Sequence, residues 1–271
     1  MRSAITICLV PEAKQGPFVF HGGLEAGCRA AAELGFDGVE VFPCSAAGLS
    51  AAELARLLDA HGLALAAVGT GAGWVRHALH LCHADAETRA RARAFIGELV
   101  DAAGGLGAPV IIGSMQGRSD GPVDRETALG WLADALHELG VRAARHGQVV
   151  FYEPLNRYET NLFNRQEEAA EFLRGRGIGN VKLLCDLFHM NIEETDLAAT
   201  LTACGDLVGH VHWADSNRRA VGFGHTAVGP AVAALEAIGY RGFLSAEVFP
   251  LPDPLSAARQ SIESFRTFAK G

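Results

Sequence analysis

Short apolar segments alternate with longer amphipathic segments along the whole chain. The short segments are almost continuously apolar, which is typical of strands buried on both faces of a parallel sheet. They predict strands at residues 4–9, 38–42, 63–68, 109–113, 149–152, 182–185, 208–212 and 243–248. The longer segments, rich in Ala, Leu, Glu and Arg, predict helices at residues 24–34, 51–61, 86–106, 126–146, 166–174, 197–204, 231–238 and 255–268.

This series of strand–helix units favours a closed (β/α)8 TIM barrel, an α/β fold, over a doubly wound open sheet. Several predicted helices are followed by glycine, as at Gly35, Gly62, Gly147 and Gly239, where helices commonly end. The first strand continues into Val-Pro-Glu-Ala-Lys-Gln-Gly-Pro, which lacks the Gly-x-Gly-x-x-Gly pattern of a dinucleotide site. Because no linker or low-complexity segment divides the chain, we predict one barrel domain over residues 1–271.

Charge and cysteine content limit the classes of partner. The formal net charge is -8, and no cluster of Lys and Arg is long enough to follow a phosphate backbone, so nucleic acid is not an expected partner. The apolar runs are far shorter than the roughly 20 residues of a membrane span, and the first residues lack the pattern of a signal peptide. The six cysteines are scattered, as is typical of reduced, buried thiols. We therefore expect a cytoplasmic protein without a membrane partner.

Four successive strands carry a polar residue at the carboxyl end, where the chemistry of such barrels is located. Glu153 follows the fifth strand, Asp186 follows the sixth, His212 ends the seventh and Glu247 lies near the end of the eighth. Each is separated from the next by about one strand–helix unit. Three carboxylates and one imidazole form a hard, oxygen-rich ligand set that suits Mn²⁺, Mg²⁺ or Co²⁺ better than a thiolate-type zinc site.

Each of these residues also has a structural interpretation. Asp186 could cap the turn that follows it, Glu153 and Glu247 could form ion pairs with nearby arginines, and a single histidine is often structural. His210 faces the same side of its strand as His212, so we expect it to be structural or to support the site. The joint occurrence at consistent spacing favours a metal site, at which a cation could hold two substrate oxygens and acidify the proton beside a carbonyl.

Four segments around these residues resemble the ketose 3-epimerases, which are xylose-isomerase-like barrels. They are EPLNRYET (153–160), CDLFHMNIEE (185–194), HVHWADSNRR (210–219) and AEVFPLP (246–252), with weaker matches in AVGTG (67–71), LHLCHAD (79–85) and VIIGSMQGR (110–118). The resemblance spans most of the chain. It extends to the D-tagatose/D-psicose 3-epimerases and is stronger to the branch that contains 5-keto-L-gluconate epimerase.

The resemblance implies a role for each of seven residues. The expected metal ligands are Glu153, Asp186, His212 and Glu247, of which Glu153 and Glu247 are also the acid–base pair; the expected substrate contacts are Glu159, His189 and Arg218. An acid–base pair is consistent with inversion of a carbon, because one group removes the proton from one face and another returns it to the opposite face. If the substrate is a keto sugar acid, its carboxylate needs a cation, for which Arg118 is the candidate. The resemblance also favours a homo-oligomer.

Several alternatives stay open at this point. An aldose–ketose isomerase of the xylose or hydroxypyruvate type would use the same fold, metal and enediolate. An apurinic endonuclease-like barrel would need further ligands and a basic face, and a non-catalytic sugar-binding barrel would need no acid–base pair. The glycine-rich loop 222–229 could hold a phosphate. That loop also departs from the family, which has an Asp-Phe pair or similar where Ala227 and Val228 stand.

Overall fold

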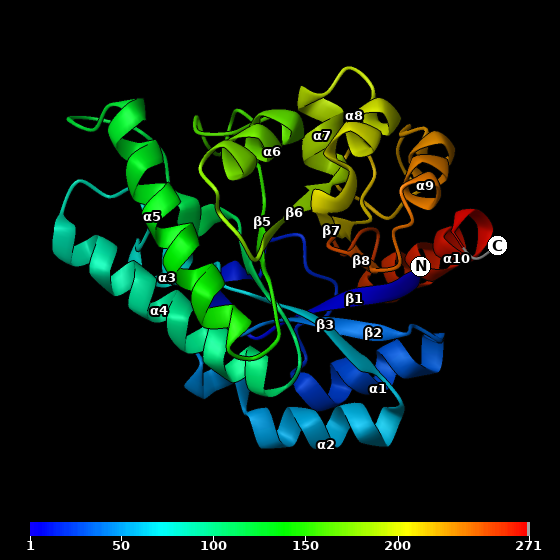
Figure 1. Ribbon diagram of the computed structural model, residues 1–271. Coiled ribbons are helices and arrows are strands. Elements are labelled where there is room, and N and C mark those ends of the chain that lie inside the picture. The colour runs from blue at the N-terminus through cyan, green and yellow to red at the C-terminus, as the bar shows by residue number, and fades with distance from the viewer. Residues whose placement is uncertain (270–271) are drawn as a thin grey trace.

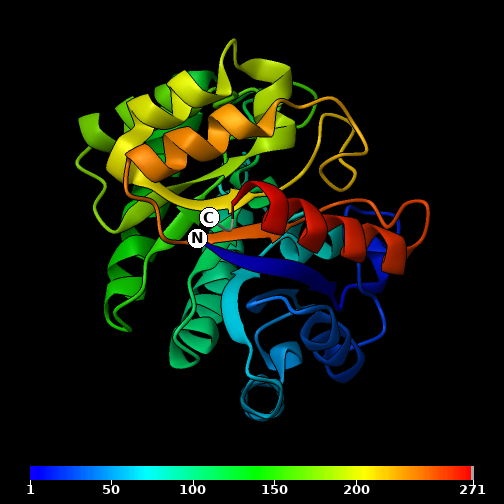
Figure 2. The same cartoon turned by 90° about the vertical axis from the view of Figure 1, so that its right-hand side faces the viewer.

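The computed structural model describes residues 1–269, and within them eight parallel strands close into a barrel in chain order (Figures 1 and 2). The barrel closes because β1 pairs with both β2 and β8. The strands are β1 (Arg2–Cys8), β2 (Gly38–Phe42), β3 (Ala64–Gly69), β4 (Val110–Ile112), β5 (Val150–Tyr152), β6 (Val181–Asp186), β7 (Val208–His212) and β8 (Phe243–Ala246). The predicted (β/α)8 architecture is confirmed.

Helices cover the outside of the barrel (Figure 1). The longer ones are α1 (Leu24–Leu34), α2 (Ala51–His61), α4 (Ala86–Gly105), α5 (Arg125–Ala144), α6 (Gln166–Gly175), α8 (Leu197–Cys204), α9 (Val228–Ala237) and α10 (Pro254–Phe268). Two shorter helices that were not predicted are α3 (Ala72–His77) and α7 (Leu187–Glu193), and the 3-10 helices are η1 (Pro11–Ala13), η2 (Ala47–Leu49), η3 (Ser114–Gln116) and η4 (Gly205–Leu207). The predicted start of α9 at residue 231 was wrong by one turn, since the helix begins at Val228.

Local interactions fix several helix ends. At the start of α4, α5, α8 and α10, an aspartate side chain accepts a hydrogen bond from a backbone N–H in the first turn. These caps are Asp85, Asp124, Asp196 and Asp253. At the other end of α1 and α2, Gly35 and Gly62 adopt left-handed φ values of 82° and 65°, which glycine reaches without a steric penalty. The predicted glycine stops are therefore confirmed at these two helices.

The barrel interior is apolar at its amino end and charged toward its carboxyl end. Near the amino end, Ala4, Ala66 and Phe243 form one buried cluster. A second cluster further along consists of Ala67, Ile111, Phe151 and Leu184. From this level onward the strands contribute fully buried polar side chains, among them a glutamate of β2 and two histidines of β7. A charge in this position needs a partner, because burial of an unpaired charge is costly.

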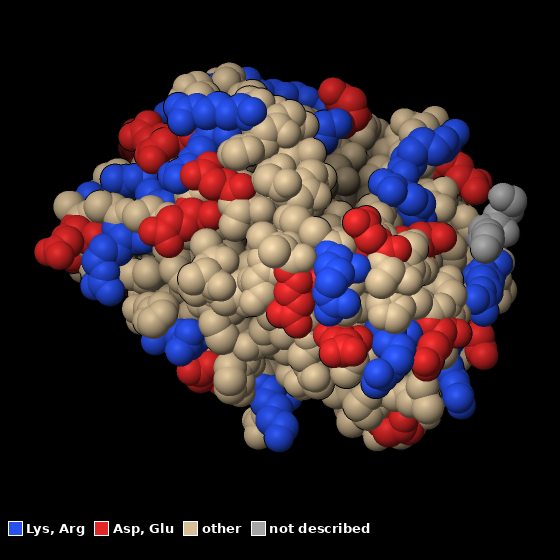
Figure 3. Space-filling view, turned by 90° about the horizontal axis from the view of Figure 1, so that it is seen from below, with Lys and Arg blue, Asp and Glu red and all other residues tan. Residues whose placement is uncertain are grey.

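The outer surface carries charges of both signs. On the face shown in Figure 3, Lys and Arg side chains are interspersed with Asp and Glu, and none of the basic side chains drawn there joins into a continuous stripe. Among residues 1–269, no helix has both the length and the apolar character that crossing a membrane requires. The six cysteines are free thiols, and five of them are buried, as the sequence predicted.

Candidate metal and active site

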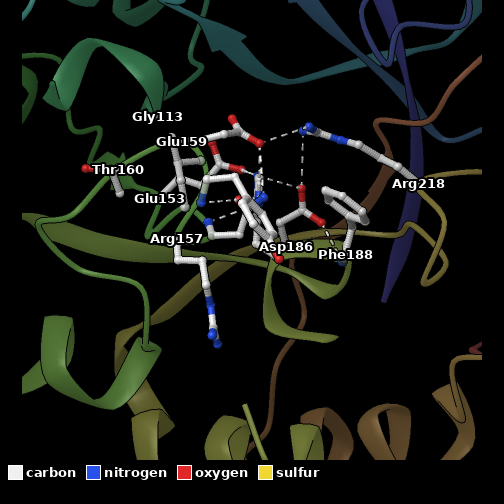
Figure 4. A network of polar contacts seen from close by, with 12 residues as sticks. Gly113, Glu153, Arg157, Glu159, Thr160, Asp186, Phe188 and Arg218 are labelled. Carbon is white, nitrogen blue, oxygen red and sulfur yellow. Dashed lines mark hydrogen bonds and ion pairs between the residues drawn. The ribbon is translucent and has the colours of Figure 1, made fainter. Parts of the chain in front are cut away.

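The four strand-end residues meet at the carboxyl end of the barrel. Glu153 comes directly after β5, Asp186 and His212 are the last residues of β6 and β7, and Glu247 comes directly after β8. His212 Nδ1 lies 3.5 Å from Glu153 Oε1, 3.5 Å from Asp186 Oδ2 and 3.6 Å from Glu247 Oε2. Side chains from four neighbouring strands therefore surround one point, and Figure 4 shows Glu153 and Asp186 approaching it from different elements.

The atoms around this point fit a divalent cation. Among the described residues, Glu153 Oε1, Asp186 Oδ2 and His212 Nδ1 are buried without a hydrogen-bond partner, and the three residues offer ligand atoms within 4.8 Å of one another. Buried acceptors that face each other are costly unless a positive charge lies between them. Carboxylate oxygens with one imidazole nitrogen form a donor set that hard divalent cations accept. The family-implied metal therefore has a suitable set of ligands in this chain.

Asp186 serves both the fold and the site. Its Oδ1 accepts a hydrogen bond of 2.8 Å from the backbone N–H of Phe188, which caps the first turn of α7. Its Oδ2 points to the convergence point described above. The capping interpretation and the metal interpretation are therefore compatible, since each uses a different oxygen of the same carboxylate.

The polar site lies at the base of a cavity of about 310 Å³. Glu153 and Glu247 line this cavity and are 5% and 6% exposed, whereas Asp186 and His212 are fully buried. The two glutamates are thus the strand-end residues that a molecule in the cavity can reach. A large part of the remaining lining is apolar and comes from Val10, Phe18, Phe42, Trp74 and Val75. A substrate would therefore contact charged groups at one end and apolar side chains elsewhere.

Burial and the neighbouring charges together shift the pKa values of the site. Burial raises the pKa of Glu153 to about 7, with His212 opposing the rise. Burial also raises the pKa of Glu247, although His212 and Arg218 oppose it. For His212, burial acts to lower the pKa, but the charges of Glu247 and Glu40 outweigh it and the pKa is raised. The clustered carboxylates thus bind positive charge strongly, as a cation site requires.

The three expected substrate contacts lie beside these residues, and Figure 4 shows two of them, Glu159 and Arg218. Arg218 places Nη2 2.5 Å from Glu247 Oε2 and Nη1 3.7 Å from Glu159 Oε1. His189 Nε2 lies 3.8 Å from Glu153 Oε1, and burial lowers the pKa of this histidine to about 4. Glu159 and Arg218 line the cavity and are within reach of a molecule held there, whereas His189 is buried behind Glu153 and is not among the lining residues.

Two other arginines, Arg157 and Arg118, do not contribute to this site. Arg157 points away from the cluster in Figure 4 and pairs with Glu193 at 2.8 Å, so it does not neutralise Glu153. Arg118, the candidate for a substrate carboxylate, is not among the residues that line the cavity, and its nearest acidic partner is Asp120 at 3.9 Å. The structure does not bring Arg118 together with the other predicted site residues.

The glycine-rich loop after β7 is organised by a protein carboxylate. Asp215 is buried and accepts hydrogen bonds of 2.8 and 2.9 Å from the backbone N–H groups of Gly222 and Gly224, and of 2.9 Å from that of Thr226. These donors are the ones that a bound phosphate would use. The phosphate-loop hypothesis for residues 222–229 was therefore wrong. The backbone of the same residue also shapes the loop that carries Arg218, since the Arg218 N–H donates to the Asp215 main-chain carbonyl oxygen.

Sequence analysis missed Glu40, a fully buried residue of β2. Its Oε2 lies 2.7 Å from His210 Nε2, and its Oε1 lies 3.2 Å from His212 Nε2. The signal was a single acidic residue inside the apolar strand sequence Gly-Val-Glu-Val-Phe. The prediction that His210 supports the site is consistent with this contact, because His210 and His212 share the Glu40 carboxylate.

Comparison with known proteins agrees with this geometry. The sequence profile of the xylose isomerase-like TIM barrels matches residues 28–268. The chain belongs to this family. It is 30% identical over 251 residues to D-psicose 3-epimerase of Agrobacterium fabrum, a match that covers 88% of this chain and 80% of that protein. Within the family, the predicted resemblance to ketose 3-epimerases is therefore confirmed, whereas the 5-keto-L-gluconate branch stays a prediction.

Two further relatives extend the comparison. The chain is 37% identical over 137 residues to 3-dehydro-D-guloside 4-epimerase of Escherichia coli, a match that covers 50% of this chain and 52% of that protein. The chain thus spans about half the length of this curated relative. The crystal structure of D-allulose 3-epimerase from Methylomonas sp. in complex with D-allulose superposes with a TM-score of 0.81 at 26% identity, covering 99% of this chain and 100% of that one.

Proposed function

We propose that this protein is a divalent-metal-dependent epimerase that inverts the carbon beside the keto group of an uncharged ketose. The observation that carries the proposal is the convergence of Glu153, Asp186 and Glu247 on His212 Nδ1. Of these four residues, the two glutamates line the cavity beside the convergence point. The similarity to D-psicose 3-epimerase over most of the chain supports it.

In this proposal four residues hold the cation: Glu153, Asp186, His212 and Glu247. Mn²⁺ is the first candidate, and Mg²⁺ and Co²⁺ are the alternatives. The bound cation would polarise the ketose carbonyl and so acidify the proton on the adjacent carbon.

Glu153 and Glu247 would transfer that proton. They stand after β5 and β8, on either side of the two strands that carry Asp186 and His212, so they approach a molecule in the cavity from two directions. Glu153 turns Oε1 toward His212 and leaves Oε2 beside Gly113 as a second oxygen able to take a proton. One glutamate would remove the proton and the other would return one to the opposite face, which inverts the carbon.

Arg218, His189 and Glu159 would orient the sugar. Arg218 donates to Glu247 and lies near Glu159, so its guanidinium is held beside the proposed acid–base group. His189 Nδ1 accepts a hydrogen bond of 3.2 Å from the Asn156 backbone N–H, which leaves the proton on Nε2, the nitrogen that faces Glu153 and Asp186. Arg218 would therefore present donors to sugar oxygens at a fixed position, whereas His189 would act through Glu153 and Asp186, the carboxylates that its Nε2 faces.

An uncharged substrate fits the cavity better than a keto acid or a sugar phosphate. Among the described lining residues, Arg218 is the only Lys or Arg, and it is already surrounded by Glu247, Glu159 and Asp186. A substrate carboxylate would thus compete with protein carboxylates for one guanidinium. The rest of the lining provides no further Lys or Arg that could pair with a substrate carboxylate.

The decisive experiment is turnover in heavy water. Purified protein with Mn²⁺ is offered D-fructose, D-allulose, D-tagatose, L-ribulose and 5-keto-gluconate, and products are analysed by NMR. We expect deuterium at carbon 3 of a 2-ketose with the keto group still at carbon 2, or at the carbon beside the keto group of 5-keto-gluconate. Turnover should be lost with a chelator and recover with Mn²⁺ or Co²⁺. Full turnover by metal-free protein would refute the metal assignment.

The same panel separates the other candidate functions. An aldose–ketose isomerase would deliver an aldose labelled at carbon 1 or carbon 2. A non-catalytic sugar-binding barrel would bind metal without turnover. The similarity to 3-dehydro-D-guloside 4-epimerase favours testing a 3-keto-glycoside as well. An aglycone of such a substrate would have space at the rim, where Trp74 and Val75 line the cavity and are 40% and 46% exposed.

A further inference from the structure

Glu40 is an acidic residue inside the barrel, without contact to solvent. It is fully buried, and each of its oxygens faces a histidine nitrogen: Oε2 lies 2.7 Å from His210 Nε2 and Oε1 lies 3.2 Å from His212 Nε2. Apolar side chains would fill a barrel interior at least as stably as a buried ionic group. Stability alone therefore does not explain this arrangement.

The backbone is irregular where this group is attached. The β2–β3 pairing shifts register between Val39 and Glu40, and the β6–β7 pairing shifts at Leu184, which pairs with His210. Such irregularities change the direction in which a side chain points and occur often beside active sites. His210 is also fixed by Phe151, whose ring stacks on it at 5.1 Å with an angle of 11° between the planes. The pairing of each strand with a neighbour is thus irregular at Glu40 and at His210.

The hydrogen bonds determine where protons reside. An ionised carboxylate only accepts hydrogen bonds, so each histidine must present an N–H at Nε2. For His212, this arrangement directs Nδ1 to the opposite side of the ring, toward Glu153, Asp186 and Glu247. Nδ1 is therefore the nitrogen available to a cation, and only its unprotonated form can ligate.

We propose that Glu40 is a positioning residue that holds His212 with its proton on Nε2 and its Nδ1 lone pair toward the metal site, and thereby sets the affinity for the divalent cation. His210 occupies the second oxygen of Glu40 and prevents the carboxylate from rotating. The inference rests on the proposed function, because it takes His212 as a metal ligand. It adds a residue of β2 to a site otherwise built from β5 to β8.

Mn²⁺ affinity tests this role without reference to turnover. Free Mn²⁺ is measured by electron paramagnetic resonance in titrations of the wild-type protein and of Glu40→Gln, Glu40→Asp and Ser245→Ala. The isosteric Gln side chain can donate its amide hydrogen to His212 Nε2, which favours the wrong tautomer, so we expect Kd to rise about 10- to 100-fold. Glu40→Asp retains the carboxylate and should recover part of the affinity. Ser245, fully buried in β8 and paired in register with His212, provides the matched control and should change Kd less than threefold.

Nitrogen chemical shifts of ¹⁵N-histidine-labelled protein give a second readout that a change in general stability would not move. With Mg²⁺ bound, the wild-type His212 should carry its proton on Nε2, and Glu40→Asp should preserve this tautomer. The Asp variant keeps the proposal testable if Glu40→Gln does not fold. A Kd for Glu40→Gln within threefold of wild type, or a wild-type His212 protonated on Nδ1 with Mg²⁺ bound, would overturn the role of Glu40. Absence of Mn²⁺ binding by the wild-type protein would instead overturn the metal site itself, and this inference with it.

Discussion

Gly113, the residue after β4, leaves the space that the Glu153 carboxylate occupies. A Cβ placed on Gly113 would overlap Glu153 Oε2, while its next contacts, the Glu153 carboxyl carbon and Leu155 Cδ2, lie at 3.5 and 3.8 Å. Ordinary contact begins near 3.4 Å, so Gly113→Ala would displace Oε2 by about 1 Å, and such a displacement of a reacting group costs on the order of 10²-fold in rate. Oε1, which faces His212, is not the atom that collides. We therefore expect turnover to fall about 10²-fold while the Mn²⁺ Kd changes less than threefold.

The matched control is Gly130→Ala in α5, where a Cβ would have no neighbour within 4 Å. This variant should keep wild-type turnover and gain about 0.5–1 kcal/mol of stability, since alanine is the better helix former. Gly113→Ala should lose about 1–3 kcal/mol from overpacking. Epimerisation rates, Mn²⁺ titration and thermal unfolding of both variants give the comparison. Wild-type turnover in folded, metal-loaded Gly113→Ala would refute the assignment of Oε2 as the proton-transfer oxygen.

Four further substitutions test the rest of the site. Glu153→Gln and Glu247→Gln should each lower turnover by about 10²-fold or more, the usual effect of removing a positioned proton-transfer group; near-normal turnover at full metal content would remove that residue from the mechanism. Arg218→Ala should lower kcat/KM about 10- to 100-fold through loss of charged hydrogen bonds, with normal metal content, whereas unchanged kinetics would leave it a structural ion pair. Asp215→Ala leaves four loop N–H groups without their acceptor and should cost about 2–4 kcal/mol in thermal or urea unfolding; a loss below about 0.5 kcal/mol would show that the loop is ordered by other contacts.

The fold was predictable because its determinants are local. The strands are almost continuously apolar, and α1, α2 and α8 have the predicted bounds because glycine or an aspartate cap marks their ends. The errors occurred where local signals mislead. Val228-Gly229-Pro230 has the composition of a loop, yet proline is compatible with the first turn of a helix. Helix α7 is too short for a periodic pattern and depends on its cap, Asp186.

The site was predictable only where it follows the strand repeat. Glu153, Asp186, His212 and Glu247 occur once per strand–helix unit at the same end of the barrel, so their convergence follows from topology. Glu40 does not follow this pattern, because it comes from the middle of β2 and its two histidine partners lie 170 and 172 residues away in sequence. Such a pairing depends on barrel closure and register, neither of which one sequence reveals.

The loop after β7 shows why composition alone leaves a possible ligand site undecided. Glycines make backbone N–H groups available, and this is equally useful for a bound phosphate and for a buried protein carboxylate. Here Asp215 provides the carboxylate from within the same loop, so the N–H groups are satisfied without a ligand. The result is a fixed support for Arg218, whose carbonyl oxygen also accepts a hydrogen bond from the Phe249 N–H after β8. The loop therefore contributes to the site through the arginine it holds against Glu247, while its backbone donors at Gly222, Gly224 and Thr226 are bound to Asp215.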